Sequence, residues 1–224
     1  LLALRELRQP AIAALLILPL IAGVLLMPAE RHTLEMSPYK GLSQTLRVSG
    51  TRIIAEHSSP LGLLSVVESP TIPLRHAPGL SLNASTEPPP QLAVFTDGDG
   101  LSAITRYDGN RQSLAHLDQL TSALPYHLRP VERGLVLGAG GGGDVLQALY
   151  HGAENIDAVE LNPQFARLVT NDYADFAGHI YDSPNVTLHI GEARSFTTGS
   201  PGDYHLIQIS LLDSFSASAS GQLA

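Results

Sequence analysis

The chain has 224 residues, of which 44% are hydrophobic and 15% are charged, and its 13 lysines and arginines against 21 aspartates and glutamates give a net charge of −8. The low charged share, set against roughly 25% in an average soluble domain, and the many apolar residues exclude intrinsic disorder and are compatible with a membrane-associated part. The lack of cysteine excludes disulfides, thiolate nucleophiles and zinc–thiolate sites, and the acidic balance disfavours nucleic acid as a partner.

An uncharged apolar segment of 17 residues, 11–27, lies near the start of the chain. It is just long enough to cross a bilayer, although Pro19 would kink such a helix. Three interpretations compete: a membrane helix, the core of a signal peptide, and a buried helix of a soluble domain. Because Pro28 follows at once and makes a poor cleavage site, we expect a membrane helix. The flanking charges leave its orientation open.

The next region is predicted to be rich in β-structure. Runs of β-branched and apolar residues at 52–57 and 63–68, separated by a Ser-Ser-Pro-Leu-Gly turn, predict a hairpin. Residues 92–96 predict a further strand, which stops at an Asp-Gly-Asp-Gly turn. Leucines at helical spacing over 114–124 predict a helix that Pro125 ends.

From Arg133 the pattern changes to apolar runs that alternate with helical stretches, which is typical of a parallel α/β sheet. Strands are expected at 135–137, 156–160, 186–190 and 204–210, and helices at 144–151 and 163–173. The predicted organisation is a membrane segment with its flank at 1–36, a small β-rich domain at 37–130 and an α/β domain at 131–224.

A glycine-rich turn follows the first of these strands. Five of the six residues from Gly138 to Gly143 are glycine, and Asp144 then opens a helix. Without Cβ atoms the backbone can turn sharply and approach a ligand closely. Glu160, 22 residues after Gly138, ends the second strand, where an acid can accept both hydroxyl protons of a ribose. The pattern predicts a nucleoside site and leaves NAD and S-adenosyl nucleosides open, while a merely flexible turn is the alternative.

The segments GLVLGAGGGGDVLQALYHGAENIDAVELN, YADF, YDSPNVTLHIGEARSF and YHLIQIS resemble the spermidine synthase (polyamine aminopropyltransferase) family, especially its membrane-fused bacterial members. The resemblance covers residues 133–216 and extends more loosely to 39–130. It implies a methyltransferase-like, Rossmann-type parallel sheet and decarboxylated S-adenosylmethionine as the substrate that serves as cofactor. Because such sheets have more strands than the four expected here, the resemblance also implies a sheet truncated at its C-terminal end, and so a fragment.

The resemblance implies cofactor-binding roles for residues at three strand ends. They are Gly138, Gly140, Gly142 and Asp144 on the sulfonium side, Glu160 at the ribose, and Glu192 with Ala193 at the adenine. Asp144 enters this set as the nearest substitute for an aspartate that is usual within the glycine motif, where this chain has Gly141.

The catalytic position departs further from the family pattern. The first of two aspartates after the fourth strand is Ser210 here, and Asp213 remains. A hydroxyl cannot act as a base near neutral pH, whereas a carboxylate can, so Asp213 is the predicted proton acceptor. Its alternative role is that of an acid stabilised at a helix N-terminus. The tyrosine that the family uses to recognise the amine aligns near Leu117.

Three functions are compatible with these residues. A membrane-anchored enzyme could transfer an aminopropyl group to a small-molecule amine, the same scaffold could transfer a methyl group from S-adenosylmethionine, or the domain could bind a nucleoside without catalysis within a polytopic membrane protein. Because the presumed cofactor is made in the cytoplasm, we expect the α/β domain at the cytoplasmic face of the cell membrane. A homodimer is one assembly that stays open.

No metal is expected, because the histidines lack the close spacing of a metal site. His127, His179 and His189 are interpreted as structural. Asp97 and Asp99 are interpreted as turn residues rather than metal ligands.

Overall fold

The computed structural model describes residues 17, 19, 36–200 and 202–210. The chain divides into two units, Leu1–Ser37 and Pro38–Ala224. Of the predicted membrane segment 11–27, only Ile17 and Pro19 lie among the described residues, and both are helical. Within the described ranges, no helix combines the length and the apolar character needed to cross a bilayer. The membrane helix therefore stays a prediction.

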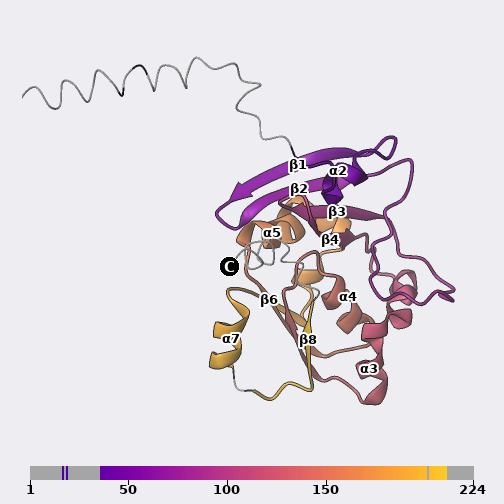
Figure 1. Cartoon of the computed structure of the whole chain (residues 1–224). Helices are drawn as coiled ribbons and strands as arrows, with labels where there is room; N and C mark the ends of the chain where they lie inside the picture. Colours follow the sequence, from indigo (N-terminus) through magenta and orange to yellow (C-terminus); the bar gives the residue numbers. More distant parts are fainter. Residues whose placement is uncertain (1–16, 18, 20–35, 201, 211–224) are drawn as a thin grey trace, which may run out of the picture. The chain divides into compact units, whose positions relative to one another are not determined.

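An antiparallel sheet of four strands, in the order β1-β2-β3-β4, forms the first part of the second unit (Figure 1). Its strands are β1 (Arg52–Ser59), β2 (Gly62–Glu68), β3 (Gln91–Thr96) and β4 (Gly100–Thr105). The predicted hairpin is confirmed, with Ser59 opposite Gly62 across the turn, and so is the third strand. Strand β4 lies outside the predicted strands, because the Asp-Gly-Asp-Gly segment is not the end of the sheet but a tight turn that pairs Thr96 with Gly100.

Asp97 and Asp99 lie in the turn between β3 and β4. Asp97 and Gly98 have φ values of 51° and 77°, so the chain reverses within a few residues. The Asp97 carboxylate accepts the Leu63 N–H at 2.9 Å, and that of Asp99 accepts the N–H of Gly41, the first residue of helix α2 (Gly41–Thr45), at 3.0 Å. Both acids are turn residues, as predicted.

The predicted helix over 114–124 is wrong in type and in its end. The segment forms the 3-10 turns η2 (Arg111–Gln119) and η3 (Thr121–Ala123), followed by the short α-helix α3 (Leu124–Leu128). Leu114 and Leu117 are buried, and their three-residue spacing fits a 3-10 turn as well as an α-helix. Pro125 lies in the first turn of α3, where its missing N–H costs nothing, so it begins a helix rather than ending one.

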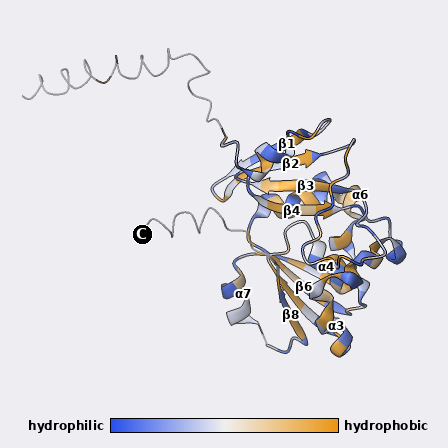
Figure 2. Ribbon diagram, turned by 45° about the vertical axis from the view of Figure 1, so that its right-hand side comes forward, coloured by the Kyte–Doolittle hydropathy of each residue, from blue (hydrophilic) through white to orange (hydrophobic). Residues whose placement is uncertain are grey.

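A parallel sheet of four strands, in the order β7-β6-β5-β8, forms the second part, which confirms the α/β fold with a parallel sheet. Its strands are β5 (Arg133–Leu137), β6 (Asn155–Glu160), β7 (Val186–Ile190) and β8 (Leu206–Ile209). The connecting elements are α4 (Gly143–Tyr150), α5 (Pro163–Arg167), the π-helical turn η4 (Leu168–Asp172), α6 (Ala174–Ala177), η5 (Ile180–Asp182) and α7 (Ala193–Gly199). Strands β3 and β8 are mostly hydrophobic (Figure 2).

The strand order places β5 between β6 and β8, and the chain runs from β5 to one side and returns later to the other. Parallel sheets bind ligands beyond the carboxyl ends of the strands at such a switch point. The carboxyl ends of β5, β6, β7 and β8 meet here. The glycine turn follows β5, Glu160 ends β6, and Glu192 and Ser210 come after β7 and β8.

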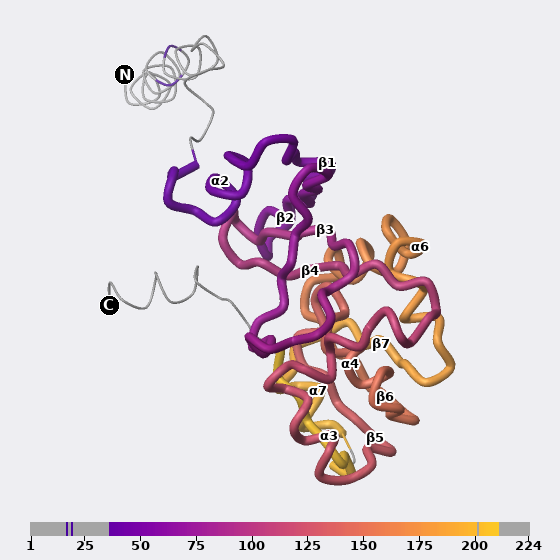
Figure 3. Tube along the Cα trace, turned by 90° about the vertical axis from the view of Figure 1, so that its right-hand side faces the viewer, coloured from indigo at the N-terminus to yellow at the C-terminus, as the bar shows by residue number. Residues whose placement is uncertain are grey.

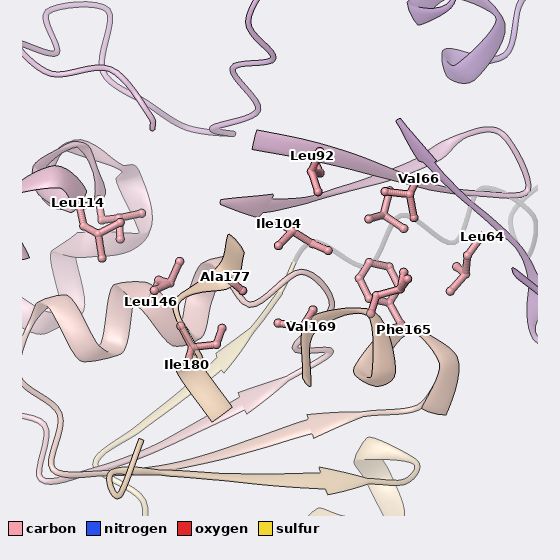
Figure 4. Packing of buried hydrophobic residues seen from close by; sticks show 13 residues of the cluster. Leu64, Val66, Leu92, Ile104, Leu114, Leu146, Phe165, Val169, Ala177 and Ile180 are labelled. Carbon is pink, nitrogen blue, oxygen red and sulfur yellow. The ribbon is translucent and has the colours of Figure 1, made fainter. Parts of the chain in front are cut away.

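One apolar core joins the antiparallel sheet to helical segments, among them α4, α5 and η4. Figure 4 shows side chains of the antiparallel sheet, among them Leu64 and Val66, directed toward Phe165 of α5 and Val169 of η4. All four are buried. In the tube view, strands β1–β4 gather at one end and β5–β7 at the other, with these helical segments between them (Figure 3). The shared core fixes the antiparallel sheet against the part of the chain that carries the glycine turn.

Candidate functional site

The glycine turn needs glycine for its backbone conformation. Gly138, Gly140 and Gly142 have φ values of 79°, 48° and 84°, which residues other than glycine rarely adopt. Helix α4 begins directly afterwards, at Gly143. The turn therefore carries β5 into α4 at the carboxyl edge of the sheet.

Glu160 is bound to this turn. It is only 8% exposed, its Oε2 accepts the Gly140 N–H at 2.8 Å, and its Oε1 accepts the Asn162 N–H at 2.8 Å. Because an ionised carboxylate has about four acceptor sites, each oxygen keeps one that these bonds do not use. A vicinal diol, such as that of a ribose, offers two O–H donors of matching spacing.

The same turn is pressed against strand β4. The Gly141 N–H donates to the Ser102 Oγ at 3.0 Å. A Cβ built on Gly141 would lie closer than 3.0 Å to both the carbonyl oxygen and the carbonyl carbon of Ala103, an approach that real Cβ atoms essentially never show. Position 141 thus admits no side chain unless the backbone of Ala103 moves.

Polar side chains line the switch point between β5 and β8. Asp144, in the first turn of α4, accepts the hydroxyl proton of Ser210 and, through its other oxygen, a bond from the Gln208 amide at 2.7 Å. The Gln208 carbonyl oxygen accepts the Tyr126 hydroxyl at 2.7 Å. Burial, and then the charge of Asp144, raise the pKa of Tyr126, so its hydroxyl stays a donor. The structure thus brings two of the predicted positions, Asp144 and Ser210, into contact.

Tyr126 and Gln208 are members of this network that the sequence analysis does not single out. Tyr126 follows Pro125 in α3, and Gln208 occupies β8, but neither belongs to a motif. A polar residue inside an apolar strand is the one signal that could have pointed to Gln208. Leu117, near which the family's amine-recognising tyrosine aligns, is 5% exposed and lies in the core.

Glu192 and Ala193 follow β7, beside Glu160. The Gly191 N–H donates to the Glu160 carbonyl oxygen at 2.9 Å, so the two strand ends are adjacent. Glu192 is exposed, and its carboxylate caps α7 by accepting the N–H groups of Arg194 and Ser195. These two bonds lower the pKa of Glu192. Its place at the sheet edge agrees with an adenine contact, which stays a prediction. Asp213 lies outside the described residues.

The three histidines interpreted as structural, His127, His179 and His189, have two kinds of surroundings. The ring nitrogens of His179 lie 2.8 Å from Asp175 and 2.9 Å from Asp182, and His189 lies 2.8 Å from Asp157. These ion pairs join neighbouring segments, which agrees with a structural role. His127 instead lies in a group with two other potential metal ligands.

Comparisons with known proteins bear on the fold. No protein-family model matches the chain, and no curated protein matches it significantly. Among solved structures, a spermidine synthase in complex with the transition state analogue AdoDATO is similar, with 18% identity, a TM-score of 0.50 and coverage of 72% of this chain. A spermidine synthase from Thermotoga maritima also has 18% identity, and the match covers 70% of this chain. Its TM-score of 0.48 is too low to support a structural argument.

The chain spans about half the length of these solved proteins, 47% of the first and 48% of the second. At this identity the first likeness shows a shared fold and nothing finer. It supports the resemblance of the chain to the spermidine synthase family at the level of the fold. This likeness does not show the membrane-fused type of that family.

The close approach of the glycine turn to β4 gives a first prediction. Replacing Gly141 by alanine should lower the free energy of unfolding by about 1–3 kcal/mol or more, because the backbone of Ala103 must move. Gly143→Ala is the matched control, since its Cβ would meet nothing within 4 Å and alanine favours the helix. Chemical denaturation measures both, and equal stability of the two variants would contradict the packing described.

Proposed function

We propose that this chain binds the nucleoside part of S-adenosylmethionine or its decarboxylated form and acts as an AdoMet-type transferase. The observation that carries the proposal is the buried Glu160 carboxylate, held by the Gly140 amide at the carboxyl edge of the sheet with one acceptor site left on each oxygen. The proposal is also supported by the fold that this chain shares with a spermidine synthase whose complex contains the analogue AdoDATO.

Aminopropyl transfer to an amine is the reaction that we propose first. The nitrogen lone pair of a neutral amine would attack the carbon next to the sulfonium, the carbon–sulfur bond would break, and methylthioadenosine would leave. The amine nitrogen would then give up one proton. Catalysis would consist mainly of alignment and proton removal.

Two carboxylates are candidates for that proton. Asp213 follows β8 by a few residues and is the proton acceptor that we propose from the sequence. Asp144 lies at the switch point in the described structure, already bonded to Ser210. We propose that Asp144 positions Ser210 and the substrate amine, whereas Asp213 accepts the proton.

Methyl transfer is the second candidate, and Gly141 is the observation that favours it. An acid within the glycine motif would repel the carboxylate that S-adenosylmethionine carries and its decarboxylated form lacks. Position 141 holds no side chain, so this repulsion is absent at that position. The membrane anchor at 11–27, a cytoplasmic α/β domain and a homodimer are kept as further proposals.

Calorimetry with methylthioadenosine tests the nucleoside site. Glu160→Gln should weaken binding at least tenfold, which corresponds to about 1.4 kcal/mol, because a charged acceptor for two hydroxyl protons is lost. Glu154→Gln, a change to an exposed acid just before the start of β6, should leave the affinity unchanged. Unchanged affinity in a Glu160→Gln protein that melts like the wild type would exclude Glu160 from the site.

Product analysis tests the reaction. With decarboxylated S-adenosylmethionine and putrescine, we expect methylthioadenosine, and Asp213→Asn should reduce turnover about a hundredfold or more as proton removal fails. Ser210→Ala should retain most of the turnover. Formation of S-adenosylhomocysteine from S-adenosylmethionine would favour methyl transfer. Binding without any product would support the non-catalytic alternative.

A further inference from the structure

Three potential metal ligands meet on the side of the molecule where α3 approaches the end of α4. Asp118 comes from η2, His127 from α3 and His151 from the C-cap of α4. Their ligand atoms all lie within 4.8 Å of one another. The Asp118 Oδ1 lies 2.7 Å from the His127 Nε2 and 3.7 Å from the His151 Nε2.

We propose that Asp118, His127 and His151 bind one zinc ion. Tetrahedral zinc with bonds of about 2.0–2.2 Å needs ligand atoms about 3.3–3.6 Å apart, and the two separations fall on either side of that range. Two imidazoles and a carboxylate are a ligand set that suits zinc better than magnesium or calcium, which prefer oxygen. With three protein ligands, a water molecule would complete the coordination.

His151 provides an independent reason to expect a ligand. Its side chain is only 10% exposed, and its Nε2 is buried without a hydrogen-bond partner. Leaving such a polar atom unsatisfied is unfavourable, and a bound metal would satisfy it.

The ring of His151 is also held in place. Tyr126 stacks on it with a centroid distance of 4.6 Å and an angle of 12° between the planes, and Tyr150 meets it edge-on at 5.1 Å. A ligand whose orientation is fixed loses little entropy on binding. His127 and Asp118 are 53% and 41% exposed, which leaves a path for the ion from solvent.

One nearby charge opposes the ion. Besides burial, Arg111, whose guanidinium lies 5.2 Å from the centre of the Tyr150 ring, lowers the pKa of His151. Its repulsion is partly offset by the carboxylate of Asp118. We therefore expect weaker zinc binding than that of four-ligand structural sites.

The site would connect to the polar network at the switch point. Tyr126 contacts His151 with its ring and Gln208 with its hydroxyl. Zinc would join α3, which carries both His127 and Tyr126, to the end of α4. The inference concerns a metal site apart from the nucleoside site and does not depend on the proposed function.

The test is a zinc titration of the chain without an affinity tag, after treatment with a chelator. We expect one equivalent of zinc to bind, and His127→Ala and His151→Gln to weaken binding at least tenfold. His179→Ala is the matched control, because His179 has two carboxylates but no second histidine beside it and should leave the affinity unchanged. No saturable binding, or equal binding by wild type and His127→Ala, would overturn the proposal.

Thermal unfolding provides a second measurement. Zinc bound only by the folded state should raise the Tm of the wild type and of His179→Ala, and should leave that of His127→Ala unchanged. His127 is half exposed, so its removal should not prevent folding. An equal rise in Tm for all three proteins would place the zinc elsewhere and overturn the proposal.

Discussion

The backbone of Gly141 lies so close to strand β4 that no side chain fits between them. This contact, together with the bond from the Gly141 N–H to Ser102, fixes the glycine turn against the antiparallel sheet. The turn in turn holds Glu160 through the Gly140 N–H. The first sheet therefore packs directly against the glycine turn.

The Glu160 carboxylate is buried and also keeps acceptor sites for a ligand. Burying a carboxylate is costly unless it is hydrogen-bonded, and the N–H groups of Gly140 and Asn162 provide those bonds. They use one acceptor site on each oxygen, so each oxygen can still accept a hydrogen bond from a diol. Preorganisation of this kind reduces the cost of binding, because the acid need not change its orientation when a ligand arrives.

The sequence predicts the elements whose signal is local. Strands β5, β6 and β7 are short apolar runs beside clear turn signals, and the glycine turn is explicit, so both the parallel sheet and the position of Glu160 could be predicted. Strand β4 is missed because its Asp-Gly-Asp-Gly turn has the same composition as a loop. The helix expected over 114–124 is wrong because leucines three residues apart also fit a 3-10 turn.

Features that depend on contacts between distant segments could not be predicted. Nothing in the sequence shows that position 141 faces the carbonyl of Ala103, 38 residues earlier. Asp118, His127 and His151 are 9 and 24 residues apart, far from the spacing of a local metal motif, and only the approach of α3 to the end of α4 brings them together. The expectation of no metal followed from spacing alone, and the zinc proposal revises it.

The central claim is that a nucleoside binds at the carboxyl edge of β5, β6 and β7. Two-dimensional amide NMR of the chain during titration with methylthioadenosine tests it most directly. We expect the largest shifts at Gly138, Gly140, Gly142 and the residues next to Glu160, with smaller ones near Glu192. Saturable binding whose shifts fall on another part of the molecule, or an absence of any shift at the glycine turn at millimolar ligand, would contradict it.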